Sequence, residues 1–280
     1  MSPTVVNLIY LIAGILFILG IKGLTKPSTA VRGNQLSSLG MLIAIVVTLL
    51  NAEVVNFTYI IAGGVFGAAV GAFMALRIQM TSMPQMVALL NGFGGGASLT
   101  IALAEYFSVL NIDANSFAEL LVPVALSSDA FGAGGEGQVT LISIGLTILI
   151  GAVTLVGSLV AFAKLQGLIK KNIGLPGGPA GNALLLLGAV IALGCLVISP
   201  NQAVTVITLV VLALLLGLFL VLPIGGADMP VVIALLNSYS GLAAALAGFI
   251  LGNTVLIIAG SLVGTSGLIL TKIMCVAMNR

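Results

Sequence analysis

The chain has 280 residues, of which 60% are hydrophobic and only 6% are charged, and its mean hydropathy is +1.31. Because an ordinary soluble domain carries about 25% charged residues, this composition excludes a soluble enzyme, and it equally excludes a disordered chain. The net charge of +2, with no basic patch, gives no indication of nucleic-acid binding. Histidine is absent, so no imidazole on this chain can bind a metal or carry a proton, and no metal site is expected.

Hydropathy predicts nine membrane-spanning helices, each near the roughly 20 residues that a bilayer requires. They cover residues 4–22, 36–51, 55–77, 84–108, 138–163, 181–199, 202–223, 229–251 and 253–276. The first is not a cleavable signal peptide in this interpretation, because it lacks a basic start. The predicted fold is an all-α, polytopic transmembrane helical bundle that occupies residues 1–280, and the connection over 110–137 is expected to cover its external surface.

The charged residues sort onto two sides of this nine-helix arrangement. All nine Lys and Arg fall after the first, third and fifth helices or at the C-terminal end, and six of the seven acids fall on the opposite side. Basic residues are enriched in cytoplasmic loops, so we expect an external N-terminus and a cytoplasmic C-terminus. An eight-helix arrangement would mix the two sets. Asp228 is the one acid on the basic side.

An internal repeat links the fourth and eighth predicted helices. Residues 83–98 read MPQMVALLNGFGGGAS and residues 229–244 read MPVVIALLNSYSGLAA, with eight of sixteen positions identical. Both copies enter the membrane from the same side, so the repeat is parallel, which argues against an inverted-repeat transporter. Each copy places an asparagine, Asn91 or Asn237, about 10 Å into the membrane. Such an amide must face protein or water, which indicates either hydrogen bonding between helices or the lining of an ion path.

Small and hydroxyl-bearing residues mark three further predicted helices. Glycines spaced by four residues are typical of helix packing in membranes, and hydroxyl groups beside them could also support a chain of water. The residues are Gly63, Gly67 and Gly71 in the third helix, Ser158 in the fifth, and Gly264, Thr265, Ser266 and Gly267 in the ninth. Asp228 begins the eighth helix, where it could cap the free amides or contact a proton or partner at a channel mouth.

Several motifs occur together in one family of membrane proteins. Residues 226–232 read GADMPVV, 236–241 read LNSYSG, 262–267 read LVGTSG and 277–280 read AMNR. They resemble the membrane domain of the beta subunit of proton-translocating NAD(P) transhydrogenases. Shorter matches extend the resemblance over nearly the whole chain, but not to 110–137.

The resemblance implies a function. Enzymes of this family couple inward proton translocation to hydride transfer from NADH to NADP⁺, with NAD(H) and NADP(H) bound in soluble domains. The NADP(H) domain is expected after Arg280, so this fragment would bind no cofactor and hold no catalytic residue. The fragment also lacks a strand–GxGxxG–helix unit. The implied setting is the inner membrane of a bacterium, in a homodimer of the whole enzyme that includes alpha-side membrane helices.

Residue by residue, the resemblance makes Asn237 a channel residue and places Ser158, Gly264, Ser266 and Gly267 along the path. Asp228 would lie at the cytoplasmic mouth, and Arg280 would begin the link to the NADP(H) domain. At Asn91 many family members carry a histidine that shuttles the proton, and this chain has none. We therefore expect a helix of the alpha-side partner to supply the histidine, with Asn91 as its hydrogen-bonding neighbour.

Two other classes of function remain open from the residues alone. A secondary solute or ion transporter could be built on the parallel repeat, and it would need a substrate cavity at the middle of the membrane and broken helices. A structural membrane anchor would need no conducting path at all.

Overall fold

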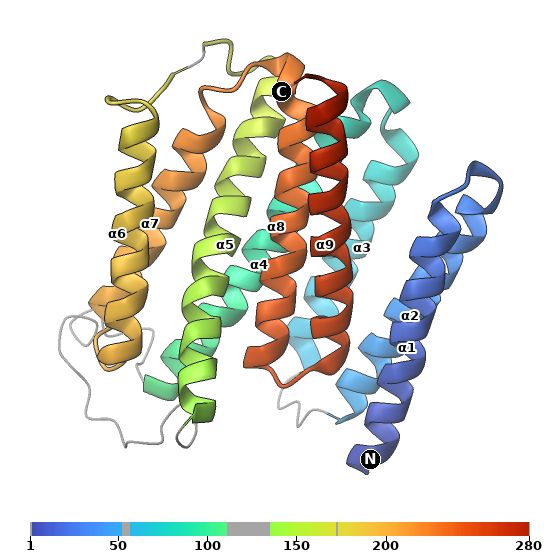
Figure 1. Ribbon diagram of the computed structural model, residues 1–280. Helices are drawn as coiled ribbons and strands as arrows, with labels where there is room; N and C mark the ends of the chain where they lie inside the picture. The colour runs from blue at the N-terminus through green and yellow to red at the C-terminus, as the bar shows by residue number, and fades with distance from the viewer. Residues whose placement is uncertain (1, 52–56, 111–134, 172, 280) are drawn as a thin grey trace. The chain divides into compact units, whose positions relative to one another are not determined.

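The computed structural model describes residues 2–51, 57–110, 135–171 and 173–279 (Figure 1). In these ranges every regular element is a helix, and nine helices are long and apolar enough to cross a membrane. They are α1 (Pro3–Leu24), α2 (Pro27–Asn51), α3 (Phe57–Arg77), α4 (Met83–Leu110), α5 (Gly135–Leu165), α6 (Pro179–Ile198), α7 (Ala203–Val221), α8 (Met229–Ile250) and α9 (Thr254–Ala277). The prediction of an all-α polytopic bundle is confirmed for this part of the chain, while most of the 110–137 connection and Arg280 lie outside the described residues.

Several helices extend beyond the hydropathy boundaries. The second was predicted to begin at residue 36, yet α2 begins at Pro27, where a proline fits the first helical turn because its missing N–H has no partner there. The 31 residues of α5 correspond to about 46 Å at 1.5 Å per residue, which exceeds a hydrocarbon core of about 30 Å. Hydropathy therefore located the apolar part of each helix and missed the polar turns that continue it.

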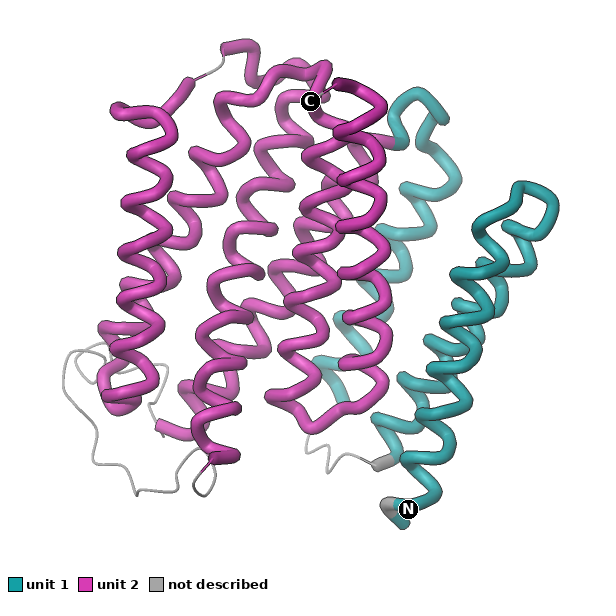
Figure 2. The backbone as a smooth tube through the Cα atoms, viewed as in Figure 1, with its two compact units in different colours: residues 1–83 teal, residues 84–280 magenta. Residues whose placement is uncertain are grey.

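The chain divides into two compact units, residues 1–83 and 84–280 (Figure 2). In the first unit, α1 and α2 form an antiparallel hairpin whose backbones meet at glycines. A Cβ on Gly23 would lie 2.7 Å from the Cα of Gly33, so neither position has room for a side chain. Tyr10 and Thr48 join the same two helices by a 2.8 Å hydrogen bond between their hydroxyl groups.

The glycine seam predicted on α3 has no packing partner in the described part of its unit. No residue of α3 is buried, and a Cβ added at Gly63, Gly67 or Gly71 would meet no atom within 4 Å. The expected role of these glycines in helix packing therefore stays a prediction, because this face of α3 is open in the described part of the unit.

The second unit is organised around α5, the helix with the most buried residues. It packs against α7 and α8, while α6 packs on α7 and α9 packs on α8. Close contacts again use glycine: a Cβ on Gly217 of α7 would lie 2.6 Å from the carbonyl oxygen of Val153 in α5. This arrangement surrounds α5 and α8 with other helices, which is where the predicted polar residues of the repeat lie.

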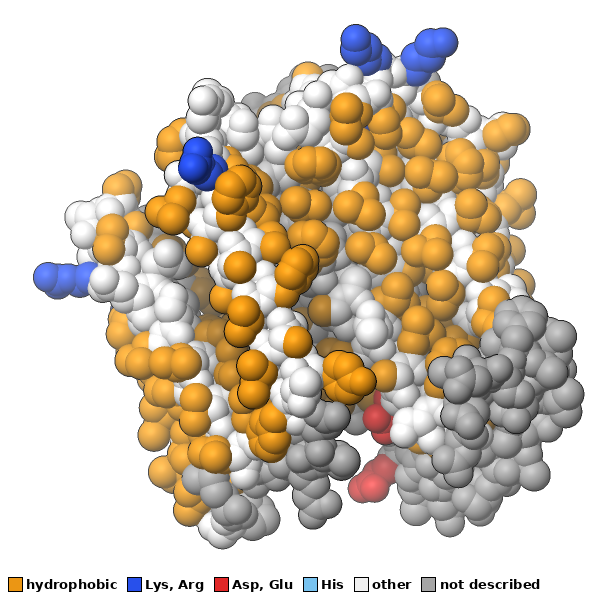
Figure 3. All heavy atoms as spheres, turned by 180° about the vertical axis from the view of Figure 1, so that it is seen from behind, with side chains coloured by type: hydrophobic (Ala, Val, Ile, Leu, Met, Phe, Trp, Pro, Cys, Tyr) orange, Lys and Arg blue, Asp and Glu red, His pale blue; other side chains and the backbone are white. Residues whose placement is uncertain are grey.

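Two charged residues of the second unit lie at the two ends of α5. Glu136 lies in the first turn of α5 and Lys164 in its last turn, and the visible face is hydrophobic between its basic and acidic groups (Figure 3). The ammonium group of Lys164 donates to the carbonyl oxygens of Leu222 and Ile224, which follow the end of α7 and have no helical partner. Lys164 thereby ties the end of α5 to the connection that leads into α8.

Candidate functional site

The two copies of the sequence repeat begin in the same way in the structure. A short 3₁₀ turn, η1 (Met80–Ser82), precedes α4, and a matching turn, η3 (Gly226–Asp228), precedes α8. The helices α4 and α8 run in the same direction (Figure 1). Equivalent positions meet, since a Cβ on Gly94 would lie 2.5 Å from the hydroxyl of Ser240, its counterpart in the repeat. The parallel repeat expected from the sequence is therefore present as a packed helix pair.

The asparagines of the repeat lie at this contact but in different states. Asn91 is 7% exposed. Its Nδ2 donates to the backbone carbonyl oxygen of Ile233 at 3.3 Å, and the backbone carbonyl oxygen of Asn91 accepts from the Ser240 hydroxyl at 3.1 Å. Residues 233, 237 and 240 share one face of a helix, so Asn237 lies on the face of α8 that meets Asn91. Asn237 is half-buried and makes no hydrogen bond to the described residues. Asn91 thus joins two helices, while the amide of Asn237 remains available to water or another group.

Ser158 lies in α5 beside the residue that follows Asn91. A Cβ on Gly92 would lie 3.1 Å from the Cβ of Ser158. The side chain of Ser158 is fully buried, and its hydroxyl has no hydrogen-bond partner among the described residues. A buried hydroxyl without a partner destabilises a protein by about 1–3 kcal/mol, so this group marks a place where water or a transient partner would be stabilised.

The contact between α8 and α9 encloses the predicted glycines. The hydroxyl of Ser238 donates to the carbonyl oxygen of Gly264 at 2.5 Å, and a Cβ on Gly267 would lie 2.8 Å from the Cβ of Ser238. Both glycines are buried, and both are needed for the close approach of the two helices.

Thr265 and Ser266 lie elsewhere, because both side chains are exposed on α9. The Ser266 hydroxyl donates to the Val263 carbonyl oxygen of its own helix at 3.0 Å. Within the second unit, therefore, the structure groups Asn91, Asn237 and Ser158 and leaves these two hydroxyls outside the group. The hydroxyls of Thr265 and Ser266 could line a proton path only if another helix packed over this face of α9.

Asp228 is the N-cap residue of α8, is half-buried, and makes no side-chain capping bond to that helix. The capping role considered from the sequence is therefore not observed, whereas its role at a channel mouth stays a prediction. Arg280 lies outside the described residues. No group of three or more His, Cys, Asp or Glu that could hold a metal occurs in the described part of the chain.

Three residues of this contact were not selected from the sequence. Ser240 bonds the backbone of Asn91, and Gly151 lets α5 approach α4, since its added Cβ would lie 2.7 Å from the Gly95 carbonyl oxygen. Thr154 is fully buried beside Gly95. Ser240 belongs to the repeat, where its matching residue is Gly94. The sequence could not show that it pairs with Asn91, because that pairing depends on which faces of α4 and α8 meet.

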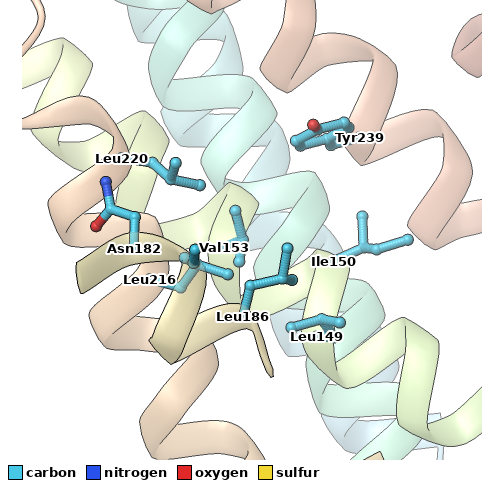
Figure 4. Close-up of a pocket in the computed structure, with 9 residues that line it drawn as sticks. Leu149, Ile150, Val153, Asn182, Leu186, Leu216, Leu220 and Tyr239 are labelled. Atoms are coloured by element: carbon cyan, nitrogen blue, oxygen red, sulfur yellow. The ribbon is translucent and has the colours of Figure 1, made fainter. Parts of the chain in front are cut away.

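A cavity of about 420 Å³ lies among α5, α6, α7 and α8, with Asn182 on the left and Tyr239 at the upper right of the view (Figure 4). These two side chains are the polar members of its lining. The others are Leu149, Ile150, Val153, Ala183, Leu186, Leu216 and Leu220. The cavity reaches α8 at the residue between Ser238 and Ser240, but none of the predicted site residues lines it.

The fold and this polar helix contact define a polytopic membrane protein built on a parallel helix repeat. The chain matches the family model described as "NAD(P) transhydrogenase beta subunit" over residues 6–280, and it therefore belongs to that family. It is 40% identical over 275 residues to the NAD(P) transhydrogenase subunit beta of Rhodospirillum rubrum, and equally to that subunit from a named strain of the same organism. The alignments cover 97% of this chain and 55% of each relative, so the chain spans about half the length of the curated relatives it matches.

Proposed function

We propose that this chain forms the proton-conducting membrane part of an NAD(P) transhydrogenase, which couples inward proton movement to hydride transfer from NADH to NADP⁺. The observation that carries the proposal is that three polar residues, Asn91, Asn237 and Ser158, lie where α4, α5 and α8 meet inside an apolar helix bundle. The chain that holds them belongs to the beta-subunit family. Polar groups within a membrane are costly and mark ion and proton paths. Hydride transfer itself would take place in soluble domains that bind NAD(H) and NADP(H), with the latter attached after Arg280.

The proposed path begins at the acidic end of the second unit and passes Asn91 and Asn237. It leaves near Asp228 and Arg280, at the end that carries Lys164 and Lys272. An amide or a hydroxyl conducts a proton only through an adjacent water or titratable group. The residues of the polar contact carry no group that titrates near neutral pH, and the chain contains no histidine. The path must therefore use water, or an imidazole from another chain.

We propose that helices of the alpha-side partner cover the open face of α9 and supply this imidazole. Thr265 and Ser266 are exposed there, and hydroxyl groups facing lipid would lack hydrogen-bond partners other than their own helix. A partner helix would bring them into the path, as the resemblance implies for Ser266. Binding of NADP(H) below the membrane would open one side of the path at a time, and the whole enzyme would be a homodimer in a bacterial inner membrane.

The function can be tested on the complete enzyme, purified with its partner subunits and placed in sealed vesicles. Reduction of NAD⁺ by NADPH should move protons in the direction opposite to inward translocation, and an imposed proton gradient should speed reduction of NADP⁺ by NADH. A pH-sensitive dye in the vesicles measures the first, and absorbance of the reduced nucleotides measures the second. Proton movement that is independent of nucleotides, together with uptake of a labelled solute, would instead support a secondary transporter.

Replacement of Ser158 by alanine should separate conduction from stability. Because its hydroxyl has no partner among the described residues, its removal should not lower the thermal unfolding temperature and should raise it, by about 2–4 °C for each kcal/mol of relieved cost. We expect nucleotide-driven proton pumping to fall severalfold if the hydroxyl holds water in the path. The matched control is Ser98→Ala, because Ser98 is also buried in this unit but bonds the carbonyl oxygen of Gly94. Unchanged pumping in Ser158→Ala would remove Ser158 from the path.

A further inference from the structure

The cavity among α5, α6, α7 and α8 is partly open to the outside of the second unit. Leu186, on its α6 side, is 47% exposed, and Ala183 beside it is exposed as well. Farther along α6 the helices touch, since a Cβ on Gly145 of α5 would lie 3.0 Å from the Cγ of Leu193. The cavity therefore occupies the stretch where α6 stands away from α5.

Water is a poor occupant of this space. A volume of about 420 Å³ equals roughly 14 water molecules at about 30 Å³ each, and a buried water needs two to four polar partners. The lining offers only two polar side chains, Asn182 and Tyr239. In a bilayer the open side faces hydrocarbon, so an acyl chain can fill the apolar lining without losing any hydrogen bond.

Asn182 gives the cavity a polar end. Its Nδ2 donates to the carbonyl oxygen of Phe219 at 3.3 Å, which fixes the orientation of the amide. Asn182 lies in the first turn of α6, at a helix end, which is where the polar part of a lipid lies.

The connection that leads into α6 adds positive charge at the same end. Lys170 and Lys171 are both exposed in it, and the sequence from residue 166 to residue 178 contains no acid. Basic groups at the surface between transmembrane helices attract anionic headgroups. A negatively charged headgroup at this end of the cavity would therefore pair with the two lysines.

We propose that this cavity binds one acyl chain of an anionic phospholipid such as phosphatidylglycerol. The chain fills the space between Val153 and Leu186, and the phosphate lies near Lys170 and Lys171. The site is independent of the proton path, because it shares no residue with Asn91, Asn237 or Ser158.

The test uses the complete enzyme, stripped of lipid in detergent and then exposed to phosphatidylglycerol or phosphatidylcholine with the same acyl chains. Native mass spectrometry counts the lipid that remains after washing. Wild type should retain phosphatidylglycerol in clear preference to phosphatidylcholine. Changing Lys170→Gln and Lys171→Gln together, at exposed positions where folding is not at risk, should reduce this preference by about tenfold or more, since each basic group contributes about fivefold.

Two substitutions on α5 and α6 complete the design. Val153→Phe should fill the cavity and reduce retention of either lipid, while Leu187→Phe, on an exposed position of α6 outside the lining, should retain lipid as wild type does. Thermal unfolding checks that each variant is folded. Equal retention of the two lipids by wild type, or unchanged retention in Val153→Phe, would overturn the site. Phosphatidylethanolamine retained as strongly as phosphatidylglycerol would overturn the requirement for an anionic headgroup.

Discussion

Replacement of Asn237 by leucine in the complete enzyme should reduce nucleotide-driven proton pumping at least tenfold, with little loss of stability. Leucine has a similar size, and the amide that it replaces makes no hydrogen bond to the described residues. Packing should therefore survive, whereas a water or imidazole in the path would lose its partner. A tenfold loss corresponds to about 1.4 kcal/mol in the barrier. Pumping is measured in vesicles and stability by thermal unfolding in detergent.

The contrast with Asn91 makes this expectation specific. Asn91→Leu should lower both pumping and stability, because it removes the bond from Nδ2 to the Ile233 carbonyl oxygen; such bonds between membrane helices contribute about 0.6 kcal/mol on average. Leu246→Met, at a half-buried position of α8, serves as the control and should change neither quantity. Pumping at the wild-type rate in Asn237→Leu would exclude Asn237 from the proton path.

Replacement of Gly241 by valine should separate α8 from α9 and strongly destabilise the protein. A Cβ at this position would lie 2.5 Å from the backbone nitrogen of Gly264 and 2.9 Å from the carbonyl oxygen of Gly260. These neighbours are backbone atoms that cannot rotate away, so the cost should reach or exceed the 1–3 kcal/mol that is typical of overpacked cores. We expect a lower unfolding temperature, a lower yield of folded protein and loss of pumping.

Gly194 provides the matched control for this substitution. It also lies within a transmembrane helix, α6, but an added Cβ there would meet no atom within 4 Å. Gly194→Val carries the same intrinsic cost of a β-branched residue in a helix, so the difference between the two variants isolates the contact of α8 with α9. Equal unfolding temperatures for the two valine variants would show that this contact tolerates a side chain.

Part of the candidate site could be predicted from the repeat. It selected Asn91 and Asn237, because a duplicated amide in an apolar segment must face a hydrogen-bonding group or water. The sequence could not distinguish them, and the structure does. Asn91 is hydrogen-bonded to Ile233 and Ser240, whereas Asn237 makes no hydrogen bond to the described residues. That difference depends on the rotation of α4 and α8 about their axes, which a motif does not encode.

The sequence by itself determined the nature of the solvent, the nine apolar helices and the repeat. Each of these follows from composition and local order, because a bilayer requires long apolar segments whose backbone hydrogen bonds are internal. Only the tertiary structure decided which small residues form contacts. Gly260 and Gly264 lie between helices, while Gly63 and Gly67 meet nothing in the described part of their unit, although both pairs have the same four-residue spacing. The tertiary structure also placed Thr265 and Ser266 on an open face, because the side of a helix that becomes buried depends on which neighbour packs against it.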